Sequence, residues 1–154
     1  MYRILLILLS FLLVAAAPKR PVMVSIIPAA PLEIAVGEKG EYSLELKIMK
    51  GYHIQANPAS EEYLIPVTVK MEATEGITVD EPIYPPGVPF RLKSSQTDIS
   101  TYEDTVRIRI PVQVNNKAKP REVVLKGTLR YQGCDAILCF PPTKLPFEAK
   151  LKIQ

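Results

Sequence analysis

The sequence contains no tryptophan, one histidine and two cysteines among its 154 residues. Without tryptophan, a hydrophobic core has to rest on valine, isoleucine, leucine, tyrosine and phenylalanine. The pattern of a tryptophan packed on an inter-sheet disulfide, found in antibody domains, is excluded as well. Zinc usually needs four nitrogen or sulfur ligands, and only His53 could join Cys134 and Cys139. We therefore expect no bound metal and no cofactor.

Neither sign of charge dominates the sequence. The formal net charge is +3, whereas nucleic-acid binding requires a concentrated basic face. Charges of opposite sign alternate, as where Arg107 and Arg109 follow Glu103, which is typical of a solvated sheet face. The sequence also shows no serine triad, phosphate loop or nucleotide motif. We therefore expect neither a nucleic acid nor a small-molecule substrate.

Sustained helical periodicity is also missing. The fifteen prolines disfavour long helices and suit strands with rigid connections. Apolar and polar residues alternate instead, which is the signature of half-buried strands. This alternation predicts strands over residues 42–48, 65–71, 106–114, 123–131 and 147–153. Such strands must pair face to face to bury their apolar sides, so we predict an all-β, immunoglobulin-like β-sandwich.

The N-terminus has the order of a secretory signal peptide. Arg3 supplies a positive charge, residues 4–14 form an apolar run broken only by Ser10, and residues 15–17 are alanines. The apolar run is short for a membrane span, and an uncleaved anchor is the alternative. We predict a signal peptide over residues 1–17, with cleavage favoured after Ala16. The protein is then periplasmic, in a compartment where disulfides form.

The rest of the chain is predicted to be one domain, because two would each be small. Residues 18–31 are a Pro-rich lead-in, whose apolar stretch 22–27 is either a linker or a first edge strand. The domain itself is expected over residues 32–154. Residues 84–102 show little alternation and are predicted to be one long loop, a length that often indicates function.

Both cysteines lie in the connection between the last two predicted strands. Four residues separate Cys134 from Cys139, and two cysteines in an exported protein usually pair. Closing so small a ring stabilises a fold by only about 2 kcal/mol. Gly133 permits unusual backbone angles, and the prolines after Phe140 stiffen the chain. From the residues alone, a redox-active pair and a plain stabilising disulfide are about equally supported.

Three further side chains could tune the cysteines. His53 could act as a cation or base towards a thiolate, although a lone histidine at a strand start is more often structural. Asp135 lies inside the ring, where it would either raise a thiol pKa or stabilise a turn. Tyr131 could donate a hydrogen bond near the sulfurs or belong to the core. The sequence leaves each pair of roles open.

A specific motif surrounds the cysteines: Tyr-Gln-Gly-Cys at residues 131–134 and Cys-Phe-Pro-Pro at residues 139–142. It resembles the N-terminal periplasmic domain of the thiol:disulfide interchange protein DsbD. Weaker similarity lies in Gly-Tyr-His-Ile at residues 51–54, at residues 84–88, and in Tyr-Glu-Asp at residues 102–104. The resemblance extends over roughly residues 31–153.

The resemblance implies an immunoglobulin-like thiol–disulfide exchange domain, a module of a protein-disulfide reductase. In the family, this domain takes electrons from a thioredoxin-like partner and reduces periplasmic disulfide proteins. The second cysteine of the motif forms the mixed disulfides, so the resemblance assigns exchange to Cys139 and resolution to Cys134. The supporting frame of the site would consist of Tyr131, Gly133, Phe140 and Pro141.

The family shields its cysteines with a cap loop until a partner docks. By position this loop lies within residues 89–102 here, with Phe90, Ser95 and Gln96 as candidate cap residues. The chain departs from the best-known member in two ways. The spacer between the cysteines is one residue shorter, and no aromatic residue lies between Lys93 and Thr101. Phe90 is the residue that can substitute for the missing aromatic.

The sequence shows neither the membrane electron-conducting domain nor the thioredoxin-like domain of the full family protein. We therefore expect its partners to be thioredoxin-fold redox proteins and a separate membrane electron-transfer protein. We also expect the protein to be a monomer. A hypothesis of a different class is a non-catalytic exported binding or scaffold β-sandwich, in which the disulfide is structural.

Overall fold

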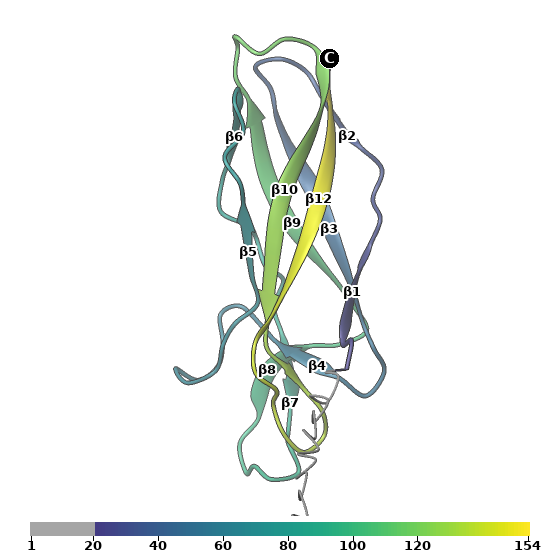
Figure 1. Cartoon of the computed structure of the whole chain (residues 1–154). Coiled ribbons are helices and arrows are strands. Elements are labelled where there is room, and N and C mark those ends of the chain that lie inside the picture. The colour runs from purple at the N-terminus through teal and green to yellow at the C-terminus, as the bar shows by residue number, and fades with distance from the viewer. Residues whose placement is uncertain (1–20) are drawn as a thin grey trace, which may run out of the picture.

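The computed structural model describes residues 21–154, which form strands, turns and loops without a helix (Figure 1). The proposed signal peptide lies outside the described residues. Within the described residues, no helix is long and apolar enough to cross a membrane.

Two sheets form the body of the molecule. The first is antiparallel, in the order β1-β3-β9-β6, and the second has the order β2-β12-β10-β5, in which β2 runs parallel to β12. The first contains β1 (Val24–Ile27), β3 (Lys39–Ile48), β9 (Thr105–Val114) and β6 (Ile77–Val79). The second contains β2 (Leu32–Ile34), β12 (Thr143–Ile153), β10 (Arg121–Tyr131) and β5 (Thr68–Met71).

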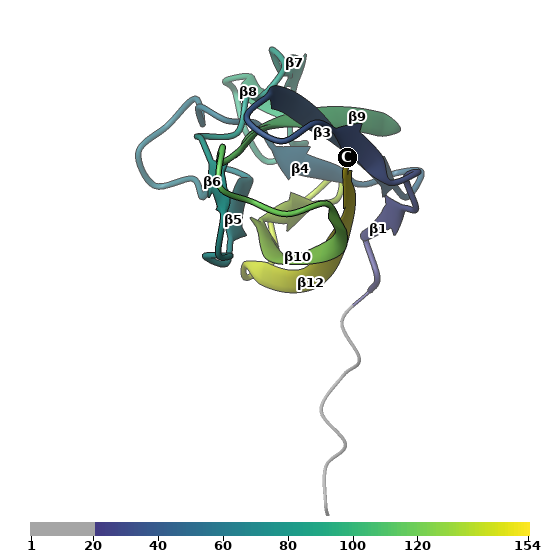
Figure 2. The same cartoon turned by 90° about the horizontal axis from the view of Figure 1, so that it is seen from above.

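The alternating residues of the long strands form the core between these sheets. Ile108 and Ile110 of β9 and Leu125 and Leu129 of β10 are each 0% exposed. Figure 2 shows β3 and β9 on one side of the molecule and β10 and β12 on the other. Since one face of each sheet is apolar, stacking the two faces removes both from water. The predicted immunoglobulin-like sandwich is confirmed.

A third, smaller sheet lies at one end of the sandwich (Figure 1). Its order is β11-β4-β8-β7. Its strands are β11 (Gly133–Cys134), β4 (His53–Gln55), β8 (Ile99–Tyr102) and β7 (Val88–Phe90). Because β11 follows β10 after a single residue, the cysteine segment continues directly out of the sandwich into this end sheet.

All five predicted strands are present, and each begins one to four residues away from its expected first residue. The strand expected over residues 65–71 begins only at Thr68. Upstream of it, the Ile65 N–H donates to the Gln132 side chain, and the Val67 N–H donates to the Gln55 carbonyl. These bonds tie the segment to the end sheet instead of to β10. The last strand is longer than expected, since β12 pairs with β10 from Thr143 onward.

The lead-in contributes a strand, because β1 pairs with β3 at the edge of the first sheet. The prediction of one long loop over residues 84–102 was wrong, since β7 and β8 pair there as a hairpin. Alternation did not reveal it because β7 carries Pro89, which is tolerated in an edge strand. In addition, Ile99, Thr101 and Tyr102 of β8 are all buried. Residues 91–98 connect the two strands, and residues 84–87 precede β7.

Candidate redox site

Cys134 and Cys139 face each other across a tight hairpin and form a disulfide. On either side of the pair, the Phe140 N–H donates to the Gly133 carbonyl at 2.8 Å, and the Asp135 N–H donates to the Leu138 carbonyl at 3.0 Å. The cysteines therefore occupy a non-hydrogen-bonded antiparallel pair, where side chains approach most closely. Their Cα atoms are 3.9 Å apart. The backbone ladder therefore places the two cysteine side chains next to each other.

Asp135 stabilises the turn of this hairpin. Its Oδ1 accepts hydrogen bonds from the Ile137 N–H at 2.7 Å and the Leu138 N–H at 2.9 Å. The bond from Leu138, followed by that from Ile137, lowers the pKa of the Asp135 carboxyl, because both favour its charged form. Of the two roles considered for Asp135, the geometry supports the turn role.

The two sulfurs differ in their exposure. Cys134 is 0% exposed and lies in a small apolar cluster with Leu64 and Ile99. Cys139 is only partly buried at the margin of this cluster. Ile137 and Leu138, which precede Cys139, are 59% and 48% exposed. A molecule arriving from solvent therefore reaches Cys139 before Cys134.

Gly133 is needed for space and not for an unusual backbone angle. It is absent from the glycines with positive φ in the described residues, which corrects the expectation from the sequence. A Cβ at this position would collide with the Sδ of Met23 and lie 2.9 Å from its Cε. Met23 is 1% exposed, just before β1. The absence of a side chain at Gly133 thus lets the segment before β1 pack behind the cysteine hairpin.

The remaining residues expected in the frame lie in different surroundings. Tyr131 is 3% exposed in the main core, where burial raises the pKa of its hydroxyl. Phe140 packs on the same core, with its ring centroid 6.4 Å from that of Tyr52. Pro141 is exposed at the start of the return to β12. Tyr131 therefore has the core role, and Phe140 anchors the outgoing arm of the hairpin.

His53 lies on β4, opposite Cys134 in the backbone pairing. Its ring stacks on Phe90 with the centroids 3.6 Å apart, and its Nδ1 lies 3.5 Å from the Glu103 Oε2. Burial lowers the pKa of His53, and the charges of Glu103 and Asp104 partly oppose this shift. The lowered pKa favours the neutral imidazole, whose ring face packs against the ring of Phe90.

The loop between β7 and β8, residues 91–98, is hydrogen-bonded to the cysteine hairpin. The Lys93 N–H donates to the Ala136 carbonyl, and the Ser94 hydroxyl donates to the Ile137 carbonyl, each at 2.9 Å. At the base of the loop, the Arg91 Nε lies 2.6 Å from the Asp98 Oδ1. This loop, which we call the cap loop, is therefore closed onto the segment that carries the disulfide.

The structure brings only one of the three predicted cap residues to the cysteines. Phe90 packs against the apolar cluster of Cys134 and Cys139, and so does Leu92, which the sequence analysis missed. Ser95 bonds instead to Thr97 within the loop, and Gln96 is exposed. An apolar residue two positions after Phe90 was the signal for Leu92, since alternate residues of a strand share a face.

Gln55, at the end of β4, also contacts the disulfide and was missed from the sequence. Its side chain is 0% exposed, and its Nε2 lies 3.2 Å from the Cys134 Sγ and 3.7 Å from the Cys139 Sγ. The signal was a lone polar residue between Ile54 and Ala56, immediately after the Gly-Tyr-His-Ile motif. Nothing local indicated that the cysteines would cover it.

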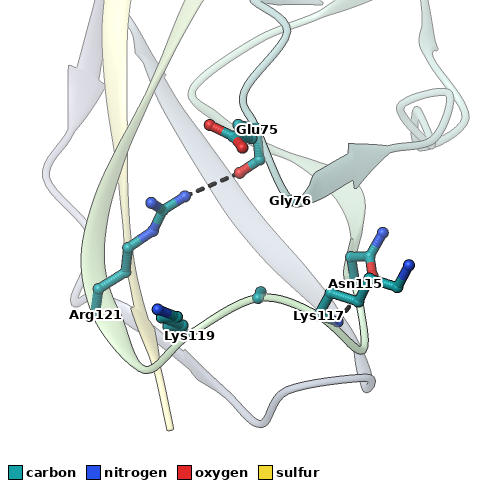
Figure 3. A pocket seen from close by; sticks show the side chains of 7 residues that line it. Glu75, Gly76, Asn115, Lys117, Lys119 and Arg121 are labelled. Atoms are coloured by element: carbon teal, nitrogen blue, oxygen red, sulfur yellow. Dashed lines mark hydrogen bonds between the residues drawn. The ribbon is translucent and has the colours of Figure 1, made fainter.

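A basic hollow of about 330 Å³ lies at the opposite end of the sandwich, in the loops next to β6, β9 and β10 (Figure 3). Arg121 donates to the Glu75 carbonyl at 2.9 Å on its rim, and Lys117 and Lys119 also line it. It contains no cysteine. Residues 21–154 hold no group of three or more histidine, cysteine or carboxylate side chains that could bind a metal.

Comparisons with known structures agree with this architecture. The chain is similar to the N-terminal periplasmic domain of ScsB from Proteus mirabilis, with 13% identity and a TM-score of 0.55. That match covers 82% of this chain and 44% of the other, so the chain spans less than half of that domain. It is also similar to the reduced DsbD N-terminal domain of Neisseria meningitidis, with 18% identity, a TM-score of 0.46, and coverage of 71% of this chain and 76% of that one. At these identities, the ScsB similarity shows the fold.

The sequence matches a family model as well. A comparison with curated proteins gave no match. The model described as "Thiol:disulfide interchange protein DsbD, N-terminal" matches residues 24–150, which include both cysteines, the end sheet and the cap loop. Because this match spans most of the chain, the protein belongs to the thiol–disulfide exchange family of the DsbD N-terminal domain.

Proposed function

We propose that this protein is a periplasmic protein-disulfide reductase module, which passes reducing equivalents from a thioredoxin-like donor to disulfide-containing partner proteins without a cofactor. One observation supports this most strongly. The disulfide joins directly opposite residues of an end hairpin, with Cys134 buried and Cys139 at the margin. A purely stabilising disulfide would more often connect distant elements, since cross-linking a longer loop stabilises more.

Cys139 is the exchange cysteine in this proposal, and Cys134 resolves the mixed disulfide. A donor thiolate attacks the Cys139 Sγ, a bond forms between the two proteins, and Cys134 leaves as a thiolate. A second donor thiolate then attacks the donor's own sulfur and releases Cys139. The donor's two thiols become a disulfide, and the Cys134–Cys139 disulfide becomes two thiols, so two electrons are transferred. The burial of Cys134 supports this order, because no protein could reach it first.

The cap loop controls access to Cys139 in the proposed cycle. Phe90 and Leu92 pack against the apolar cluster that contains Cys134, and hydrogen bonds from the Lys93 N–H and the Ser94 hydroxyl hold the loop to the hairpin. For the loop to move, these two hydrogen bonds and the apolar contacts of Phe90 and Leu92 have to break. A docking partner can replace them while it covers the exposed Ile137 and Leu138. The partners proposed are thioredoxin-fold proteins and a separate membrane electron-transfer protein.

Trapping of a mixed disulfide tests this function. In a Cys134→Ser variant, Cys139 lacks its resolving partner, so a complex with a thioredoxin-fold protein activated by a thionitrobenzoate leaving group should accumulate. A Cys139→Ser variant is the matched control, since its remaining thiol is buried. Equal trapping by both variants, or none by either, would contradict the assigned roles.

We propose export through the signal peptide over residues 1–17, which N-terminal sequencing of periplasmic protein would test.

The full burial of Cys134 beside Leu64 and Ile99 favours a second function, a scaffold domain with a structural disulfide. A titration with reduced and oxidised glutathione separates the two. Exchange predicts a pair that titrates within the range of the glutathione couple. A structural disulfide stays oxidised to potentials below about −300 mV.

A further inference from the structure

Gln55 is held rigidly against the buried side of the disulfide. Its backbone N–H donates to the Gln132 carbonyl at 3.0 Å, and its carbonyl accepts from the Val67 N–H at 3.2 Å. Since both of these backbone groups are hydrogen-bonded, the Cα of Gln55 is held in place. It places Nε2 at 3.2 Å from the Cys134 Sγ and 3.7 Å from the Cys139 Sγ, with 0% exposure.

Stability does not account for an amide at this position. Sulfur is a weak acceptor, so the bonds that Nε2 donates contribute little in the disulfide form. The Oε1 of Gln55 is buried and has no hydrogen-bond partner in the described part of the protein. A buried polar atom without a partner costs free energy, whereas an apolar side chain of similar shape would avoid that cost. The amide has to be explained by another state of the site.

That other state is the thiolate. We propose that Gln55 takes part directly in the exchange reaction: its Nε2–H stabilises the negative charge that develops on Cys134 when the Cys139 Sγ is attacked. This inference deepens the exchange function proposed above and rests on it. The neutral disulfide sulfur is a poor acceptor, but a thiolate accepts a charge-assisted bond that is about twice as strong. The donor therefore stabilises the departing sulfur more than the disulfide, as catalysis requires.

The attack on the Cys139 Sγ exchanges one sulfur–sulfur bond for another. The incoming thiolate forms a bond to the Cys139 Sγ, the S–S bond breaks, and its electron pair goes to the Cys134 Sγ. No proton moves in this step. Because Cys134 is 0% exposed, water cannot solvate the new charge, and burial alone would raise the pKa of its thiol. Gln55 opposes that shift. A leaving sulfur of lower pKa leaves faster.

The same contact serves the reverse direction. When reduced Cys139 attacks a target disulfide, Cys134 must later attack the mixed disulfide as a thiolate. A donor at Gln55 keeps a larger fraction of Cys134 deprotonated. One buried amide therefore assists the resolving cysteine both as leaving group and as nucleophile.

The test replaces Gln55 with methionine, which has a similar length and no donor. The oxidised Gln55→Met protein should be reduced by dithiothreitol at pH 7 on the order of tenfold more slowly, the loss expected for one charged hydrogen bond. In a Cys139→Ser background, the same change should raise the pKa of the Cys134 thiol by about 1, followed by thiolate absorbance at 240 nm. The melting temperature of the oxidised protein should be unchanged or higher, which a merely structural role does not predict.

Thr101→Val is the matched control. Thr101 is the β8 partner of Gln55, is also 0% exposed, and donates its hydroxyl to the Val88 carbonyl at 3.4 Å, not to a sulfur. It should alter neither the reduction rate nor the Cys134 pKa. A Gln55→Leu variant repeats the test with a different apolar shape. Wild-type rates and pKa in both Gln55 variants would overturn the inference and leave the exchange function intact. A wild-type disulfide that resists dithiothreitol would overturn both.

Discussion

The His53 ring stacks on the Phe90 ring with the centroids 3.6 Å apart and the planes inclined by 21°. His53 belongs to β4, whose backbone pairs with Cys134, whereas Phe90 is the residue from which the cap loop begins. The stack thus connects the strand that pairs with Cys134 to the start of the cap loop. A change in the charge of His53, or in the size of either ring, should therefore affect both β4 and the cap loop.

The first prediction concerns pH. Burial lowers the pKa of His53 in the folded protein below the 6.5 of an unfolded chain. As the pH falls below 6.5, the unfolded state binds the proton first, so the free energy of unfolding falls until the pH passes the lowered folded pKa. Urea unfolding at pH 7.5 and 5.5 should show a larger loss in the wild type than in a His53→Gln variant.

A Glu103→Gln variant provides a second check on the direction in which His53 makes stability depend on pH. Glu103 raises the pKa of His53, so its neutralisation should lower that pKa further and enlarge the loss of stability at pH 5.5. Equal pH dependence of the wild type and both variants would show that His53 does not couple protonation to folding.

The second prediction concerns the cap loop. A Phe90→Ala change removes the stack on His53 and the cover on the cysteine cluster. Aromatic contacts of this kind contribute about 0.5–1.5 kcal/mol. The reduced protein should therefore react about two- to tenfold faster with iodoacetamide at Cys139, because the open state is more populated. Tyr63→Ala, which deletes an aromatic 74% exposed in another loop, is the control. If Phe90→Ala reacts with iodoacetamide no faster than the wild type, Phe90 does not limit access to Cys139.

The third prediction concerns Gly133. An alanine Cβ would collide with the Sδ of Met23, which is itself buried. Gly133→Ala should lower the free energy of unfolding by about 1–3 kcal/mol, as overpacking usually does. Combining it with Met23→Ala makes room for the methyl group, so the double variant should lose less than the two single losses together. Simple additivity would mean that the two residues do not compete for space.

The fourth prediction concerns the turn between the cysteines. Asp135→Ala removes the acceptor of the Ile137 and Leu138 N–H groups and should lower the melting temperature. Asp135→Asn keeps an acceptor oxygen but not the charge, so it should retain most of the stability. Since an anion nearby disfavours a thiolate, Asp135→Asn should also lower the pKa of the Cys139 thiol, followed at 240 nm in a Cys134→Ser background. An unchanged pKa would limit Asp135 to its turn role.

Patterns within single segments anticipated much of the protein. Alternation in residues 42–48, 106–114 and 123–131 predicted the long strands, because a strand with one apolar face has few other ways to bury it. The motif around Cys134 and Cys139 likewise identified the family. The hairpin of β7 and β8 was missed, because Pro89 and a strand buried on both faces obscure the period of two.

The sequence by itself determined the sandwich and the pairing of Cys134 with Cys139, since both follow from residues close together in the chain. Only the tertiary structure decided what surrounds the pair. Gln55 contacts Cys134 from 79 positions away, a Cβ at Gly133 would collide with Met23, and Leu92 packs against the apolar cluster that contains Cys134. Such contacts depend on the register of the end sheet and the direction of the cap loop. The register and the loop direction arise from packing the whole domain, and no local pattern of residues encodes them.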